Sequence, residues 1–253
     1  MNTTLDGRTA LVTGSTRGIG FAIARALLDQ GARVIVHGRD AETVKHAADR
    51  LDAGERVETA VADLGTEEGT DQLIAQVVNG PLDILVNNAA ILRCDGMTPR
   101  AECLEFFEVN ALAGMQLAQV LLPLIIRQDD DGRLIWISSE AALMPSAKML
   151  PYAMSKAAQL VLSMCFAEMA AGTSVTSNTV VVGPTRTEGA DAFLNEARVT
   201  WPEVMAGYPA TKLGRPSEAE EIAAFVAWLA SPASSAMRGA AVRVDGGVIP
   251  TIV

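Results

Sequence analysis

Cysteine and aromatic residues are scarce in this chain of 253 residues, which contains three cysteines and has 4% aromatic side chains. The thiols, Cys94, Cys103 and Cys165, are isolated and have no metal-ligand spacing, which argues against a disulfide framework and a zinc site. We therefore expect a reducing compartment, and a small, buried, apolar role for each thiol. Few aromatic residues beside many Ala and Val suit small-residue helices packed against a parallel sheet.

Basic residues are also few, since 20 Lys and Arg stand against 30 Asp and Glu, a formal charge of −10. An acidic chain of this kind is a poor candidate for binding nucleic acid or an anionic membrane. The first residues lack a basic region followed by an apolar one, so we expect no signal peptide. The longest apolar run, 111–126, is interrupted by Gln116, Gln119 and Pro123 and is not expected to cross a membrane. We therefore predict a cytoplasmic protein that binds no metal.

What the sequence does contain is a regular alternation of strand-like and helix-like segments, which predicts an α/β domain. We predict strands at 9–13, 33–37, 56–61, 82–86, 133–137, 174–182 and 241–244. Helices are predicted at 21–30, 41–51, 66–78, 100–127, 151–171 and 216–230. No repeat or linker is visible, which indicates one domain over residues 1–253. Residues 188–215 are predicted to be irregular, and we interpret 186–215 as a substrate lid, with ordinary core filling as the alternative.

A cluster of glycines lies between the first strand and the first helix. It reads Gly14-Ser15-Thr16-Arg17-Gly18-Ile19-Gly20. Glycines at this place let a pyrophosphate approach the helix N-terminus, whereas an ordinary turn is the plainer interpretation. The spacing G-x-x-x-G-x-G differs from the commoner dinucleotide pattern G-x-G-x-x-G.

Two arginines indicate which dinucleotide would bind. The second strand ends in Gly38-Arg39-Asp40, where an acidic residue would bind a ribose 2′-hydroxyl and an arginine would suit a 2′-phosphate. Arg17 is a second guanidinium that can reach the same phosphate. In a chain of charge −10 this pair favours NADP over NAD, with two solvated surface arginines as the alternative. The acidic residue next to Arg39, Asp40, weakens this prediction of NADP.

Polar residues also follow other strands, at the edge where ligands bind in open α/β sheets. Asp63-Leu64 follows the third strand, Asn87-Asn88-Ala89-Ala90 the fourth and Ser138-Ser139 the fifth. Asn110 falls inside the long predicted helix, an unfavourable place for Asn that needs a reason if the side chain is buried.

Tyr152 and Lys156 are four residues apart near a helix start that Pro151 marks, so they share one helical face. A fixed cation stabilises a phenolate and lowers the pKa of a tyrosine from about 10 toward the range of an acid/base catalyst. A solvated surface pair is the usual alternative for such a spacing.

Together these residues resemble the short-chain dehydrogenase/reductase family across essentially the whole chain. Residues 13–20 resemble its TGxxxGIG loop, and 87–90 its NNAG motif with Ala90 in place of glycine. Ser139 stands thirteen residues before Tyr152, as the family's catalytic serine does. Residues 183–187 resemble PGxxxT, with Val182 where proline is usual, and 245–247 match the terminal DGG. The two departures affect loop geometry rather than chemistry.

The resemblance implies a Rossmann-type, doubly wound sheet of seven parallel strands, and a role for each matching residue. Tyr152 would exchange a proton with the substrate oxygen, and Ser139 would hydrogen-bond that oxygen. Lys156 would lower the pKa of the tyrosine and bind the nicotinamide ribose. Asn110 would hold a water in a proton path from Lys156. Cofactor contacts are implied for residues 14–20, Arg39, Asp63, Leu64, Asn88, Tyr152, Lys156, Gly183, Thr185 and Thr187.

The implied reaction is NADP(H)-dependent reduction of a ketone or 3-oxo group, or oxidation of the matching secondary alcohol. The predicted pocket residues, Ile91, Leu92, Ala141, Leu143, Met144 and Leu150, are mostly apolar, which favours a small or medium hydrophobic substrate. Glu140 and Glu188 would either contact a polar or cationic group or be surface charges. The rivals are an NAD-dependent alcohol dehydrogenase of the same family and a non-catalytic dinucleotide-sensing protein.

Relatives that act on acyl carrier protein carry basic residues that dock this acidic partner. The corresponding positions here are Asp130 and Thr173, so we expect weak or no activity with a carrier-bound substrate. The family implies a homotetramer or homodimer, which fits the apolar helices predicted at 100–127 and 151–171.

Overall fold

Seven parallel strands form the centre of the molecule in the computed structural model, which describes residues 3–93, 99–127 and 131–250. The strand order is β3-β2-β1-β4-β5-β6-β9. The strands are β1 (Thr9–Val12), β2 (Arg33–Gly38), β3 (Val57–Val61), β4 (Ile84–Asn87), β5 (Arg133–Ser139), β6 (Thr176–Val182) and β9 (Ala241–Val244). Because β1 pairs with both β2 and β4, the chain reverses its winding direction there. This order is that of a Rossmann-type doubly wound sheet, with the switch point between β1 and β4.

The strands are apolar along their length because both faces of the sheet are covered. In β5, Ile135 and Ile137 face one core and Leu134 and Trp136 face the other. Trp136 stacks on Phe166 of a covering helix with ring centroids 5.7 Å apart. The small and branched residues expected from the composition therefore fill two separate cores.

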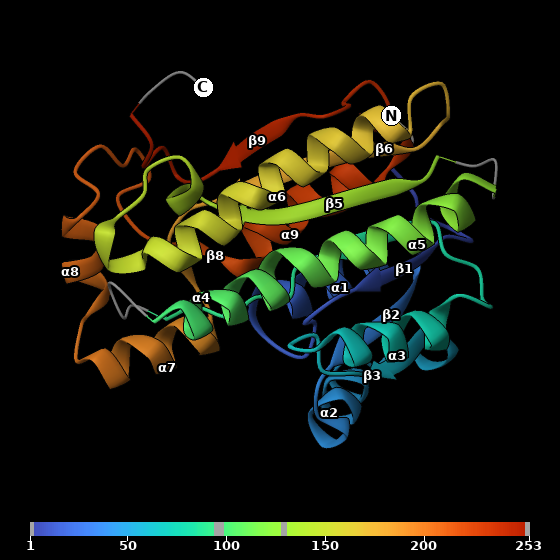
Figure 1. Cartoon of the computed structure of the whole chain (residues 1–253), viewed down its shortest axis with the longest axis horizontal. Helices are drawn as coiled ribbons and strands as arrows, with labels where there is room; N and C mark the ends of the chain where they lie inside the picture. Colours follow the sequence, from blue (N-terminus) through green and yellow to red (C-terminus); the bar gives the residue numbers. More distant parts are fainter. Residues whose placement is uncertain (1–2, 94–98, 128–130, 251–253) are drawn as a thin grey trace.

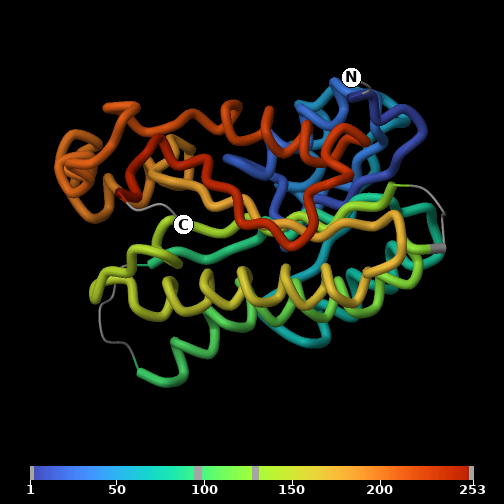
Figure 2. Tube along the Cα trace, turned by 90° about the horizontal axis from the view of Figure 1, so that it is seen from above, coloured from blue at the N-terminus to red at the C-terminus, as the bar shows by residue number. Residues whose placement is uncertain are grey.

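Helices cover the two faces. The helices are α1 (Gly18–Asp29), α2 (Ala41–Leu51), α3 (Glu67–Val77), α4 (Arg100–Phe107), α5 (Ala113–Arg127), α6 (Leu150–Met169), α7 (Glu188–Ala197), α8 (Trp201–Ala206) and α9 (Ala219–Ala230). α1 and α9 lie behind the sheet, whereas α4, α5 and α6 cross its front (Figure 1). From above, α6 and the α4–α5 segment run side by side in one layer (Figure 2).

The predicted helix over 100–127 is confirmed, with a π-helical turn, Glu108–Leu112, between α4 and α5. Gln116, Gln119 and Pro123 do not interrupt it, because Gln119 and Pro123 are exposed and the backbone bond that Pro123 removes faces water. By length and composition alone, the segment Arg100–Ile126 could cross a membrane. Its residues Leu117, Leu121 and Ile125 are instead buried against the sheet.

The prediction of an irregular segment over 188–215 is wrong, because α7 and α8 occupy part of it. Local caps explain both helices: Thr187 accepts a hydrogen bond from the Ala190 amide, and Glu203 accepts one from the Thr200 amide. Short strands β7 (Thr185–Arg186) and β8 (Ser217–Glu218) pair at the base of the segment. α7 and α8 lie at one end of the molecule, on the left in Figure 1.

The prediction of buried thiols is wrong for two of the three cysteines. Cys165 is exposed on α6 and Cys103 is half-buried on α4. Cys94 lies outside the described residues.

Candidate active site

The loop between β1 and α1 is fixed by a buried histidine. The Nδ1 atom of His37 accepts a hydrogen bond from the Gly14 amide (3.1 Å), and its Nε2 donates to the carbonyl of Ala62 (3.2 Å). Burial lowers the pKa of His37 to about 4, so the ring is neutral at physiological pH and can accept at Nδ1. Ser15 adds a second tie, because its Oγ donates to the Val12 carbonyl and accepts from the His37 amide.

The β4 loop is joined to the same glycine loop by Asn88 and Thr13. The Nδ2 atom of Asn88 donates to the carbonyls of Thr13 (2.8 Å) and Gly14 (3.1 Å). The hydroxyl of Thr13 accepts from the amides of Asn88 and Ala89. These bonds hold the ends of β1 and β4 together at the switch point.

Two glycines of the loop are required by close contacts. A Cβ atom on Gly20 would stand 2.4 Å from Asn88 Nδ2 and from the carbonyl oxygen of Gly14. Gly14 has a φ of 63°, and a Cβ there would meet the Ala89 Cα at 2.9 Å. α1 begins without a side-chain cap or an acidic residue in its first turn. Its free amide groups form a site suited to a phosphate, so this loop fits a dinucleotide.

The two predicted phosphate-binding arginines start from neighbouring backbone. A Cβ on Gly38 would lie 2.6 Å from the Thr16 side chain, so Arg17 and Arg39, one residue further on, begin side by side. Both side chains are exposed, and neither makes an ion pair or hydrogen bond within the described part of the chain. The Asp40 carboxylate caps α2 by accepting from the Thr43 amide (2.9 Å), which lowers its pKa. Asp40 therefore has a structural role next to the two free cations.

Ser139, Tyr152 and Lys156 come together where β5 meets α6. The Ser138 hydroxyl donates to the Lys156 carbonyl (2.8 Å), which ties the helix to the strand. The Lys156 Nζ lies 5.7 Å from the centre of the Tyr152 ring and donates to the Ile137 carbonyl (2.8 Å). Tyr152 is half-buried, whereas Ser139 and Lys156 are buried. The ammonium thus lies beside the tyrosine ring, on the helix face that the spacing predicts.

The electrostatics of Lys156 are set by burial. Removal from water lowers the pKa of its ammonium group to about 7, and the nearby charge of Glu140 opposes this shift. A lysine of this pKa changes its charge near neutral pH.

Asn110 is buried in the π-helical turn, and its side chain is held by three hydrogen bonds. The side-chain amide exchanges two hydrogen bonds with the backbone of Ile91 and donates to the Ser155 hydroxyl (3.0 Å). The backbone carbonyl of Asn110 accepts a bond from Gln159 Nε2 (2.7 Å), and Gln159 Oε1 in turn accepts from Lys156 Nζ (3.3 Å). The Gln159 side chain thus connects Lys156 to Asn110.

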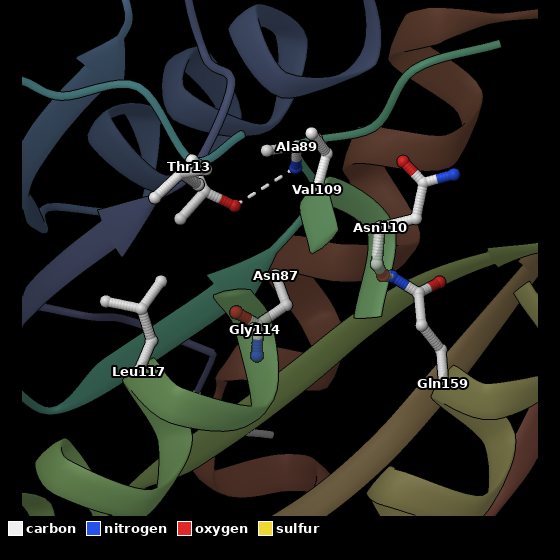
Figure 3. Close-up of a pocket in the computed structure, with 9 residues that line it drawn as sticks. Thr13, Asn87, Ala89, Val109, Asn110, Gly114, Leu117 and Gln159 are labelled. Carbon is white, nitrogen blue, oxygen red and sulfur yellow. Dashed lines mark hydrogen bonds between the residues drawn. The ribbon is translucent and has the colours of Figure 1, made fainter. Parts of the chain in front are cut away.

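A small cavity of about 10 Å³ lies beside this connection, lined among others by Asn87, Asn110 and Gln159 (Figure 3). The buried Asn87 amide has no partner for its oxygen or its nitrogen within the described residues. A cavity of this size takes about one water molecule, for which the partnerless Asn87 amide offers a donor and an acceptor.

Glu140 gives the site a buried carboxylate. One of its oxygens accepts from the Ser139 hydroxyl (2.6 Å) and the other from the hydroxyl of Tyr208 (2.7 Å), which belongs to the 186–215 segment. Glu188, the other acidic residue considered for the pocket, instead lies 3.8 Å from Arg50 at the surface.

The loop after β6 completes the arrangement. A Cβ on Gly18 would stand 3.2 Å from the Thr187 Cβ, so the glycine loop and the 183–187 loop touch. Thr185 is buried, and its hydroxyl donates to the Gly183 carbonyl (2.8 Å). Asp63 is exposed, and Leu64 is buried beside the small cavity.

Comparison with known proteins shows the family of this chain. A sequence profile described as short chain dehydrogenase matches residues 8–198. The uncharacterized oxidoreductase YvaG of Bacillus subtilis is 43% identical, with all of both chains covered. The 3-oxoacyl-[acyl-carrier-protein] reductase FabG of Vibrio cholerae is 32% identical over 96% of this chain and 98% of its own. The structure of L-sorbose reductase from Gluconobacter frateurii with NADPH and L-sorbose superimposes with a TM-score of 0.91, at 27% identity and full coverage of both chains.

The chain belongs to the short-chain dehydrogenase family. It is an oxidoreductase that acts on CH–OH or C=O groups with NAD(P). The short-chain dehydrogenase fold also accounts for the position of each motif at the carboxyl edge of the sheet.

Sequence reasoning missed three residues of this short-chain dehydrogenase site: His37, Gln159 and Tyr208. The signal for His37 was a histidine near the carboxyl end of a predicted strand, at the edge of the sheet where the glycine loop also lies. Gln159 lies one turn after Lys156 on an otherwise apolar helix, which was also readable. Tyr208 had no such signal, because it is 68 residues from Glu140 in the chain.

Proposed function

We propose that this short-chain dehydrogenase reduces a ketone or 3-oxo group with NADPH, or oxidises the matching secondary alcohol with NADP. The observation that carries the proposal is the convergence of Ser139, Tyr152 and Lys156 at the end of β5. The buried ammonium lies 5.7 Å from the centre of the tyrosine ring, and Ser139 is the last residue of the strand that Ser138 ties to the same helix. When bound, the nicotinamide supplies or accepts the hydride.

In this proposal Tyr152 donates a proton to the substrate oxygen during reduction and removes it during oxidation. Ser139 hydrogen-bonds the same oxygen and holds it in place. Lys156 stabilises the tyrosinate and binds the nicotinamide ribose, and the Ile137 carbonyl holds its amino group (2.8 Å).

The proton that Tyr152 loses returns along a path that begins at Lys156. Gln159 joins Lys156 to the Asn110 carbonyl, and the cavity beside Asn87 has room for the water implied at Asn110. The partnerless Asn87 amide would bind that water.

For the cofactor we propose a preference for NADP over NAD. The glycine loop 14–20 and the free amides of α1 would hold the pyrophosphate, and Arg17 and Arg39 the 2′-phosphate. The remaining proposed cofactor contacts are Asp63, Leu64, Asn88, Tyr152, Lys156, Gly183, Thr185 and Thr187. Support comes from the absence of side-chain partners for either arginine in the described residues, and from the capping role of Asp40.

The coenzyme proposal is tested by the dissociation constants of NADPH and NADH at moderate salt, followed by quenching of Trp fluorescence. We expect NADPH to bind at least about tenfold more tightly, since each guanidinium–phosphate contact contributes on the order of 1–2 kcal/mol. Arg39→Asp should reverse the preference. If this variant still prefers NADPH, the role assigned to Arg39 is wrong, and equal affinities in the wild type would favour an NAD-linked alcohol dehydrogenase.

The catalytic proposal is tested by Tyr152→Phe. This variant should retain NADPH binding and lose at least about a thousandfold in turnover of any ketone that the wild type reduces. A Tyr152→Phe enzyme that retains turnover would remove the tyrosine from the mechanism. A wild type that binds NADPH and turns over no ketone or alcohol would favour a dinucleotide sensor.

We propose that acyl carrier protein is not a partner of this enzyme. Thr173 contributes no charge, and the guanidinium of Arg238 beside it is engaged by the carbonyls of Thr173 and Val175. Asp130 lies outside the described residues. Turnover of carrier-bound acetoacetyl groups should be slow and insensitive to salt, whereas fast and salt-sensitive turnover would reverse this conclusion.

We further propose a cytoplasmic homotetramer or homodimer built from one domain, residues 1–253, with residues 186–215 as a substrate lid. The helices α4, α5 and α6 lie side by side and expose large apolar residues on their outer face. Exposed patches of this kind mark protein–protein contacts. These residues are Leu104, Leu112, Val120, Met154, Val161, Met164 and Met169.

A further inference from the structure

Glu140 is a charged residue in a site whose predicted lining is otherwise mostly apolar. Its side chain is 8% exposed, and no Lys or Arg forms an ion pair with it in the ranges 3–93, 99–127 and 131–250. It is the direct neighbour of Ser139, whose hydroxyl it binds at 2.6 Å. Burying a carboxylate without a paired cation costs free energy even where it accepts hydrogen bonds. The position of Glu140 beside the serine therefore calls for a function.

Glu140 offers acceptors toward the substrate. Ser139 has one hydroxyl proton, which it gives to Glu140 in this structure, while its oxygen accepts from the Ala141 amide at 3.2 Å. When Ser139 turns that proton toward a substrate carbonyl oxygen, Glu140 Oε2 is left without a donor. Tyr208 also gives its single proton to Glu140. A carboxylate has about four acceptor positions, of which these two bonds use two. The ligand that best complements this cluster brings hydroxyl protons of its own.

We propose that Glu140 is a specificity-determining residue that selects neutral carbonyl compounds with a hydroxyl on the carbon next to the carbonyl, and the corresponding vicinal diols. The same residue rejects substrates with a carboxylate at that place. The inference rests on the proposed function, because it takes Ser139 as the group that meets the substrate oxygen.

The geometry places the carboxylate within reach of that neighbouring carbon. An oxygen hydrogen-bonded to Ser139 Oγ lies about 2.8 Å from it. Since Glu140 Oε2 lies 2.6 Å from the same Oγ, the substrate oxygen and the carboxylate are at most about 5.4 Å apart. A hydroxyl on the next carbon spans that gap and donates to Glu140, whereas an anionic group there is repelled by the carboxylate.

A plainer role would be that Glu140 only fastens Tyr208 and thereby the 186–215 segment. Two variants distinguish the fastening of Tyr208 from the selection of substrate. Tyr208→Phe removes the fastening bond and keeps the charge, whereas Glu140→Gln removes the charge and keeps an amide of the same shape. Substrate selection should follow the charge.

The experiment compares three ketones that differ only beside the carbonyl: cyclohexanone, 2-hydroxycyclohexanone and 2-oxocyclohexanecarboxylate. For the wild type we expect kcat/KM with NADPH to be at least about tenfold higher for the hydroxyketone than for cyclohexanone, and lowest for the carboxylate. Glu140→Gln should raise kcat/KM for the carboxylate at least about tenfold relative to cyclohexanone. Glu140→Ala should also remove the preference for the hydroxyketone. Tyr208→Phe and a distant control, Glu55→Gln, should keep the wild-type order.

Equal kcat/KM for the three ketones, or an order that Glu140→Gln leaves unchanged, would overturn the proposal. If none of the three is turned over, the dissociation constants of the same compounds for the enzyme–NADP complex are measured, and the same order is required. Each variant is first titrated with NADPH. Unchanged cofactor binding and loss of turnover in Tyr152→Phe would uphold the proposed function even where this inference fails.

Discussion

Acidification should destabilise this protein through one histidine, His37. Burial lowers the pKa of its ring from 6.5 to about 4. The folded pKa lies below the unfolded one, so the unfolded chain takes up the proton first. The contribution of the neutral His37 ring to the free energy of unfolding is therefore fully present above pH 6.5 and is lost as the pH falls from 6.5 toward 4. With these two values the loss attributable to His37 is about 2 kcal/mol at pH 5 and about 3 kcal/mol at pH 4.

The assay is urea unfolding at pH values between 7.5 and 4.5, in wild type and in His37→Asn. The Asn oxygen can still accept from the Gly14 amide and does not titrate. We expect the free energy of unfolding of the wild type to fall by about 2 kcal/mol more than that of the variant between pH 7.5 and pH 5. NADPH affinity of the folded protein should hold down to about pH 5 and fall only near pH 4, where the folded ring takes up the proton and loses the acceptor that holds the glycine loop.

The chain provides its own control, since its other histidine, His46, is exposed on α2. His46→Asn should keep the pH dependence of the wild type. Parallel loss of stability in the wild type and in His37→Asn would refute the reasoning, because the carboxylates common to both would then account for all of the acid sensitivity.

Three further variants test the packing of the site and the outer helix face. Gly20→Ala should lose NADPH binding and about 1–3 kcal/mol of stability by thermal unfolding, because its Cβ would stand 2.4 Å from Asn88 Nδ2; near-wild-type affinity would contradict this. Gln159→Leu removes the link between Lys156 and Asn110 and should lower kcat more than it raises KM, so a change confined to KM would argue against its place in the proton path. Val161→Asp, on the exposed face of α6, should reduce the molar mass measured by light scattering, and an unchanged mass would place the subunit contact elsewhere.

The sequence alone determined the sheet and the position of the site, because local patterns specify both. The seven predicted strands and the long helices are confirmed, with boundaries shifted by at most three residues. Glycines between a strand and a helix, and polar residues after β4 and β5, marked the edge where the loops meet. The spacing of Tyr152 and Lys156 fixes their common face, because four residues correspond to one helical turn.

Only the tertiary structure decided how the site is held together, because the contacts join residues far apart in the chain. His37 reaches back 23 residues to Gly14, Gln159 reaches Asn110, and Tyr208 crosses 68 residues to Glu140. No local pattern encodes such pairs. The segment 188–215 was misjudged because its helices are short and depend on caps, and Cys165 because a helix can be apolar on a face that the sheet does not cover. The sequence placed the reacting groups, and the fold decided which charges and hydrogen bonds surround them.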